Sequence, residues 1–79
     1  MKNLYVGNLD YNITEYELRG AFEAYGQVDN VTIVRDTGTG QPRGFGFVEM
    51  ANDDEAEKSI AGTNGTQLGG RNINVNEAR

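Results

Sequence analysis

The segment Arg43–Met50, read as Arg-Gly-Phe-Gly-Phe-Val-Glu-Met, combines aromatic and basic side chains in an alternating pattern. Side chains alternate between the two faces of a β-strand. Arg43, Phe45 and Phe47 are therefore predicted to share one face, together with Glu49. The opposite face carries small and apolar side chains, as a face packed on helices would. Two phenylalanine rings beside an arginine on the more polar face form a surface on which nucleic-acid bases can stack.

A second aromatic segment, near the start of the chain, shows the same alternation. In Leu4–Leu9, read as Leu-Tyr-Val-Gly-Asn-Leu, Tyr5 faces away from the apolar Leu4 and Val6. The two segments together resemble the paired signatures of the RNA recognition motif family. One signature is the octapeptide Lys/Arg-Gly-Phe/Tyr-Gly/Ala-Phe-Val-x-Phe/Tyr, and the other is a hexapeptide with an aromatic second residue and a closing Asn-Leu.

All six hexapeptide positions and seven octapeptide positions fit, and the resemblance covers essentially the whole chain. The exception is Met50, which stands where Phe or Tyr is usual. Because alternation places Met50 on the apolar face, we expect it to alter packing and to leave the aromatic face unchanged.

The segments between the signatures predict the elements that would hold these two strands. Thr14 and Glu17 form a capping box at the start of a helix. The apolar stripe of this helix runs to Tyr25, and Gly26 is suited to end it. Gly20, inside the helix, costs about 1 kcal/mol relative to alanine, and close packing is the only explanation that the sequence offers.

Two further strands and a second helix complete the pattern. Val28–Arg35 is predicted to be a strand that a polar turn joins to Arg43–Met50, and Asn52–Glu55 begins a helix with acidic residues in its first turn. After a Gly-rich connection over 63–70, Asn72–Asn76 is the last predicted strand. This order predicts an α+β fold, a ferredoxin-like βαββαβ sandwich with a four-stranded antiparallel sheet and two helices packed on one face. The resemblance implies that the two signature strands are central neighbours.

Length and composition limit the classes of function. The 79 residues are expected to form a single RNA recognition motif domain, residues 1–79. With no Cys and no His, the sequence lacks thiolate zinc ligands and the commonest general base, so we expect no enzyme, no metal and no cofactor. The sequence has no signal peptide and no apolar run of about 20 residues. A cytoplasmic protein is therefore expected, or a nuclear one in a eukaryote.

The net charge of −5 argues against a nucleic-acid binder, since such domains are usually basic. Most acidic residues, however, are predicted on the helices, behind the sheet. They are Glu15, Glu17, Glu23, Asp53, Asp54, Glu55 and Glu57. The basic residues expected on or near the open face are Arg43, Lys2, Arg35 and Arg79. Glu49 and Glu77 are the acids expected to oppose a phosphate most directly.

The resemblance implies binding of single-stranded RNA, in a role such as post-transcriptional regulation or RNA chaperoning. Tyr5 and Phe47 would stack successive bases, Phe45 would pack on a sugar or between two of them, and Arg43 would contact a phosphate. Asn74, Asn76 and the backbone at Ala78 would hydrogen-bond base edges. The surface is completed by Asn3, Thr32, Val34 and Glu49. Single-stranded DNA remains an alternative ligand, because stacking does not test the 2′-hydroxyl group.

Few charged contacts predict binding near 1 μM and a shallow salt dependence. The protein is expected to be a monomer. A protein of this length resembles the small single-domain RNA-binding proteins of bacteria, including cyanobacteria. The Gly-rich or basic tail that those bacterial proteins usually carry is not in this sequence. The alternative function is a protein–protein interaction module on the same scaffold, which the acidic charge favours. Small acyl-phosphate hydrolases share the topology but need an arginine in the loop after the first strand, and Gly7–Asp10 has none.

Overall fold

The computed structural model describes residues 1–78 of the chain, and within them it contains two helices and six strands. In chain order the elements are β1 (Lys2–Gly7), α1 (Glu15–Glu23), β2 (Val28–Arg35), β3 (Pro42–Met50), α2 (Asp53–Thr63), β4 (Gln67–Leu68), β5 (Arg71–Asn72) and β6 (Asn74–Glu77).

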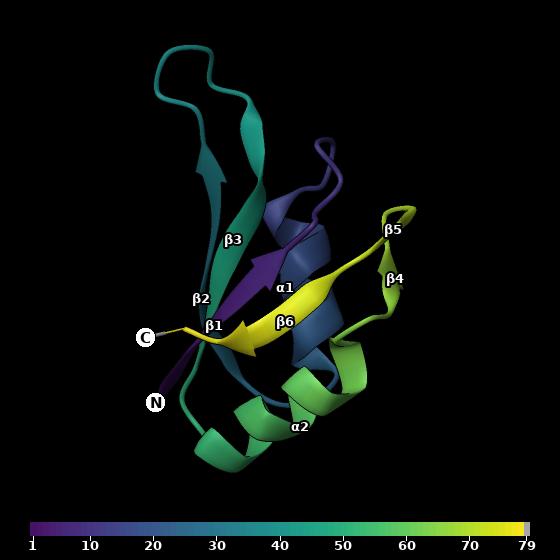
Figure 1. Ribbon diagram of the computed structural model, residues 1–79. Helices are drawn as coiled ribbons and strands as arrows, with labels where there is room; N and C mark the ends of the chain where they lie inside the picture. The colour runs from purple at the N-terminus through teal and green to yellow at the C-terminus, as the bar shows by residue number, and fades with distance from the viewer. Residues whose placement is uncertain (79) are drawn as a thin grey trace.

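The main sheet has four strands in the order β2-β3-β1-β6, and every neighbouring pair is antiparallel. Figure 1 shows both helices on one side of this sheet, which leaves its other face open. The predicted α+β, ferredoxin-like arrangement is therefore confirmed. The two signature strands are adjacent at the centre as β1 and β3, because the crossover through α1 and the β2–β3 hairpin brings the chain back beside its first strand.

The core lies between the sheet and the helices and is built by the alternation that the sequence predicted. Leu4 and Val6 of β1 and Val48 of β3 are fully buried, as is Phe22 of α1. Met50 is also fully buried, and the Ser59 hydroxyl lies 3.4 Å from its sulfur. The departure at the eighth signature position is thus a matter of core packing.

Both helices begin where the sequence predicted. The Thr14 hydroxyl accepts a hydrogen bond from the Glu17 N–H at 3.1 Å, and the Asn52 side chain accepts one from the Glu55 N–H at 3.0 Å. Each bond satisfies an N–H group that has no partner within its own helix. These caps fix the points at which the chain leaves β1 and β3 to cross behind the sheet.

The end of α1 differs from the prediction. The helix stops at Glu23, and the Tyr25 N–H bonds to the Phe22 carbonyl at 3.0 Å in a tighter final turn. Gly26 is not among the glycines with positive φ, so it does not end the helix in the left-handed conformation that the prediction assumed. A Cβ atom there would instead overlap the Glu55 side chain, which packs against this loop from α2.

Gly20 does not mark close packing, contrary to the expectation. The residue is exposed, and a Cβ atom added to it would meet no atom within 4 Å. The glycine therefore occupies an interior helix position without a steric reason for its small size.

The connection before the last strand is more ordered than predicted. Within it, β4 and β5 form a two-stranded hairpin, with Gln67 opposite Asn72 and Leu68 opposite Arg71. The turn residues, Gly69 and Gly70, have φ values of 63° and 92°. A two-residue turn in which both φ values are positive suits a tight hairpin and favours Gly-Gly. The last sheet strand consequently begins at Asn74 and not at residue 72.

Among residues 1–78, neither helix has the length and apolar character needed to cross a bilayer. The same part of the chain contains no cluster of three or more carboxylate, imidazole or thiol side chains placed to hold a metal ion.

Candidate nucleic-acid interface

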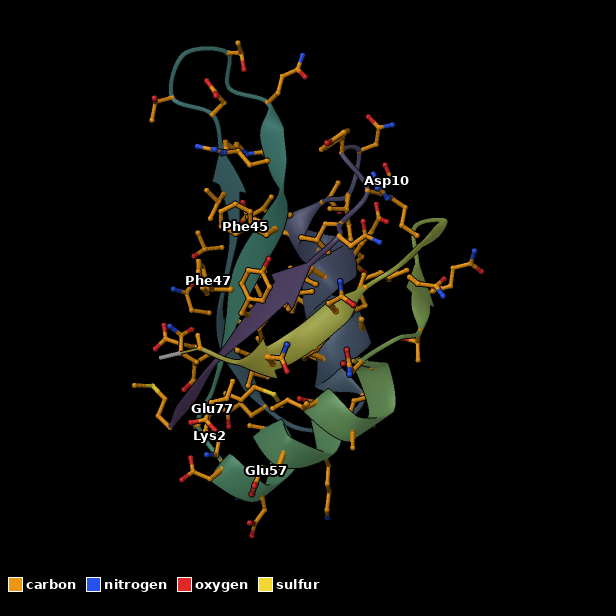
Figure 2. All side chains as sticks on the ribbon, in the orientation of Figure 1. Lys2, Asp10, Phe45, Phe47, Glu57 and Glu77 are labelled. Carbon is orange, nitrogen blue, oxygen red and sulfur yellow. The ribbon has the colours of Figure 1, made fainter. Side chains whose placement is uncertain are left out.

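Three aromatic rings meet on the open face of the sheet, and we call Tyr5, Phe45 and Phe47 the aromatic platform. The ring centroids of Tyr5 lie 5.9 Å from Phe45 and 6.1 Å from Phe47, and those of the two phenylalanines lie 6.2 Å apart. Phe45 and Phe47 are nearly perpendicular, at 89°, an edge-to-face contact that fixes both rings. All three are half-buried, so each ring keeps solvent-exposed surface. Figure 2 shows Phe45 and Phe47 along β3, on the side of the sheet away from the helices.

Strand register explains this convergence. Tyr5 of β1 is directly opposite Phe47 of β3, and Phe45 precedes Phe47 by two residues on the same face. Phe47 is in turn opposite Thr32 of β2, and Tyr5 is opposite Asn76 of β6. One row of side chains thus crosses all four strands, with two aromatic rings at its centre and a polar side chain at each end.

A glycine in the first signature makes room for one ring. Gly7 follows Tyr5 by two residues on the same face, and a Cβ atom on Gly7 would lie 2.6 Å from the Tyr5 hydroxyl oxygen. The Tyr5 ring therefore lies over Gly7, where any larger residue would displace it. The sequence indicated the aromatic residue but not this support beneath it.

A hollow of about 190 Å³ lies beside Phe47, and we call it the Phe47 hollow. It brings together three predicted site residues, Asn3, Thr32 and Glu49, and adds Asn30 of β2. Asn30 could have been predicted, because it alternates with Thr32 along the same strand. The hollow joins amide, hydroxyl and carboxylate groups to the edge of the platform.

The remaining predicted residues occupy the margins of the sheet. Val34 is half-buried on β2, at a register irregularity between Ile33 and Arg35. Asn74 and Asn76 are exposed on β6. The Ala78 N–H donates a hydrogen bond to the Asn3 carbonyl at 2.7 Å. That amide extends the pairing between the end of the chain and β1.

A second hollow, of about 310 Å³, lies at the other end of the platform, and we call it the arginine hollow. Tyr5, Phe45, Arg43 and Asn74 contribute to its lining, together with residues that were not among the predicted site residues: Asn8, Leu9, Tyr11, Gly44 and Arg71. The Gly44 carbonyl accepts a hydrogen bond from the Leu9 N–H at 2.8 Å, which ties the start of β3 to the loop after β1. Arg43, the residue before Gly44, lines this hollow together with Tyr5 and Phe45 of the platform.

The acidic residues lie where the sequence placed them. All seven predicted helical carboxylates are within α1 or α2, on the far side of the sheet from the platform. Exposed charges farther apart than about 10 Å are largely screened at ordinary salt concentrations. The net negative charge is therefore compatible with an anionic ligand on the open face.

The expectation that Lys2 lies near the open face is wrong. Its ammonium group pairs with the Glu77 carboxylate at 3.0 Å, and the hydrogen bond to Glu77 raises the pKa of Lys2. Figure 2 shows this pair toward α2 and Glu57, away from Phe45. Lys2 is two residues before the buried Leu4 on β1, so their side chains point to the same face of the sheet, the face that the helices cover. Arg35 is exposed at the end of β2, and Arg79 lies outside the described residues.

Comparison with known proteins agrees with this geometry. A sequence model of the RNA recognition motif matches residues 4–74. The cyanobacterial protein RbpA of Nostoc sp. strain PCC 7120 is 44% identical over 77 residues, which cover 98% of this chain and 76% of RbpA. By contrast, the chain spans only 16% of the human protein named Probable RNA-binding protein 23, with 42% identity over 72 residues.

Solved structures show the same fold. The crystal structure of RNA binding protein PG1 superposes with a TM-score of 0.95 at 40% identity, covering 99% of this chain and 94% of PG1. A Sxl-lethal protein–RNA complex gives a TM-score of 0.91 at 37% identity, covering 98% of this chain and 47% of that one.

Proposed function

The chain belongs to the RNA recognition motif family, and on that premise we propose that it binds single-stranded RNA by stacking bases on the aromatic platform. The observation that carries the proposal is the convergence of Tyr5, Phe45 and Phe47 on the face of the sheet that no helix covers. These half-buried rings lie outside the core between the sheet and the helices. They offer two or three successive bases a surface to stack on.

Each side chain on this face has a role in the proposal. Tyr5 and Phe47 stack neighbouring bases, and Phe45 packs against a sugar or between the two. Arg43 contacts a phosphate. The base edges meet hydrogen-bonding groups or apolar contacts at the margins of the platform. The residues in these contacts are Asn3, Thr32, Val34, Asn74, Asn76 and Ala78, while Glu49 faces the same surface and opposes phosphate.

The magnitude of binding follows from these contacts. Each stacked base is worth about 1–3 kcal/mol. Two or three stacks with one or two charged contacts, less the cost of ordering the strand, give a dissociation constant near 1 μM. With one or two phosphates contacted, the slope of log affinity against log salt should be about −0.7 to −1.4.

We further propose that residues 1–79 act as one monomeric domain in the cytoplasm, in post-transcriptional regulation or as an RNA chaperone, without catalysis. Specificity for RNA over single-stranded DNA would come from contacts with the 2′-hydroxyl group, since stacking alone does not distinguish the two.

The test is a fluorescence anisotropy titration of a labelled pool of eight-nucleotide single-stranded RNA. Wild type is compared with a Tyr5→Ala/Phe47→Ala double variant, which should bind at least about thirtyfold more weakly because it loses two stacks. Tyr16→Ala is the matched control, because Tyr16 is 85% exposed on α1 and lies outside the platform. Circular dichroism melts establish that all the variants are folded.

Two results would contradict the proposal: no binding by wild type at about 100 μM RNA (well above the expected dissociation constant), or equal binding by the folded double variant. A salt slope steeper than about −4, equivalent to six or more phosphates, would show that charge and not stacking dominates. The same titration with DNA of matching sequence measures the contribution of the 2′-hydroxyl groups.

The second candidate is a protein–protein interaction module that uses the helical face. Seven carboxylates on α1 and α2 and the exposed ring of Tyr16 favour a basic partner there. This function predicts that Tyr16→Ala, and not the platform double variant, weakens the interaction.

A further inference from the structure

We propose that Arg71 forms a second nucleotide subsite in the arginine hollow, where it binds the phosphate of a nucleotide adjacent to those stacked on the platform. The inference rests on the proposed function and extends it to a residue outside both signature segments. Arg71 lies in β5, at the end of a hairpin that brings it beside the open face.

Two neutral groups fix the position of the Arg71 guanidinium. Its Nη2 donates a hydrogen bond to the Asn8 side-chain oxygen at 3.0 Å, and its central carbon lies 5.8 Å from the centroid of the Tyr11 ring. The Asn8 amide nitrogen in turn donates to the Asn72 carbonyl at 2.7 Å. A guanidinium group has five N–H donors, so this arrangement orients Arg71 while leaving donors for a ligand.

The charge around Arg71 favours an anion. Within residues 1–78, the ion pairs involve the Met1 ammonium group, Lys2 and Arg19, and none includes Arg71 or Arg43. No carboxylate is among the residues that line the arginine hollow, although the chain as a whole carries a net charge of −5. Asp36 lines an adjoining hollow with Arg43, and Asp10 lies beside Gly69 at the hairpin turn, but neither carboxylate forms an ion pair with Arg43 or Arg71 within residues 1–78. Two guanidinium groups without an ion-pair partner at one hollow are suited to phosphate, which guanidinium binds through paired hydrogen bonds.

The position of the hollow points to a nucleotide and not to a free anion. Tyr5 and Phe45 belong both to the platform and to the lining of the hollow. A strand whose bases stack on these rings therefore brings its next phosphate to Arg43 and Arg71. The volume of about 310 Å³ is within the range of small-molecule sites.

The competing explanation is purely structural, namely that Arg71 stacks on Tyr11 only to hold the β4–β5 hairpin against the loop after β1. The two explanations differ in salt dependence. A phosphate contact contributes about 0.7 to the slope of log affinity against log salt for a single strand. A packing contact within the protein contributes nothing to that slope.

The experiment measures binding of the eight-nucleotide RNA pool from low to moderate salt for wild type, Arg71→Gln and Lys58→Gln. Lys58→Gln is the matched control because it removes the same charge from an exposed position on α2. We expect Arg71→Gln to lower the affinity about tenfold at low salt and to reduce the slope by about 0.7, whereas Lys58→Gln leaves the slope unchanged.

A third variant, Arg71→Lys, keeps the positive charge and loses the planar fork. It should retain the wild-type slope if Arg71 contacts phosphate, even where its affinity falls. If folded Arg71→Gln has the wild-type slope, or matches Lys58→Gln in both affinity and slope, the subsite is refuted while the platform remains intact. Failure of wild type to bind, or equal binding by the platform double variant, would instead refute the proposed function itself.

Discussion

Replacing Gly20 by alanine should stabilise the protein without changing its affinity for RNA. Gly20 lies inside α1, is exposed, and offers open space to a Cβ atom out to 4 Å. The substitution therefore adds no clash and buries no new surface. What remains is the helix propensity difference between glycine and alanine, about 0.8–1.0 kcal/mol in favour of alanine.

For a domain of this size, about 1 kcal/mol corresponds to a rise of roughly 4–8 °C in the melting temperature. Urea titration should show a higher midpoint with an unchanged m value, because the surface exposed on unfolding hardly changes. Anisotropy titration should give the wild-type dissociation constant, since α1 lies behind the sheet and away from the platform.

A melting temperature equal to or below that of wild type would refute this reasoning, because it would mean that the glycine serves a conformation or contact that a Cβ atom disturbs. A changed affinity for RNA would refute the conclusion that α1, on one face of the sheet, acts independently of the aromatic platform on the other face. If the result is as expected, Gly20→Ala also provides a more stable background for the platform variants. Effects of distant substitutions usually add to within about 0.5 kcal/mol.

Three further predictions concern the open face and its edge. Gly7→Ala should displace the Tyr5 ring and weaken RNA binding by up to the value of one stack, about 1–3 kcal/mol, whereas an anisotropy curve within twofold of wild type would show that the ring does not need Gly7. Glu49→Gln should raise affinity about twofold at low salt and less at high salt, because it removes a carboxylate beside the RNA; lower affinity would mean that the carboxylate accepts hydrogen bonds from bases. The pairing with Glu77 raises the pKa of Lys2, so its contribution to stability is present below about pH 10 and is lost as the pH rises through the raised value. The difference in melting temperature between wild type and Lys2→Met should therefore shrink as the pH rises through the raised pKa of Lys2, and a difference that does not change with pH there would contradict the ion-pair explanation.

Strand alternation predicted which face of each strand the rings of the aromatic platform occupy, and the family resemblance implied that the two strands are neighbours. Alternation placed Phe45 and Phe47 on one face and Met50 in the core, and the register of β1 and β3 then put Tyr5 opposite Phe47. The same rule, applied to Lys2, would have shown that it shares the face of Leu4. Only the positive charge of Lys2 suggested that it lies on the open face. The charge of a residue at the end of a strand does not determine the face of the sheet toward which its side chain points.

The residues missed by the sequence are those whose positions depend on distant contacts. Arg71 reaches Asn8 across 63 positions of the chain, and no local periodicity encodes that approach. Its hairpin has strands of two residues each, too short to show alternation, although Gly69-Gly70 was a readable sign of a tight turn. Likewise, the space above Gly7 becomes apparent only when the Tyr5 side chain is in place.

The pairing of β1 with β3 also bears on how RNA would act on the folding equilibrium. Tyr5 and Phe47 are 42 positions apart and become neighbours only when these two strands pair. An unfolded chain therefore has no platform, and a strand of RNA that needs both rings binds only the folded state. Such a ligand stabilises the protein by mass action, by about 2.7 kcal/mol at a free concentration one hundred times the dissociation constant. RNA would therefore stabilise only those molecules in which β1 and β3 are paired.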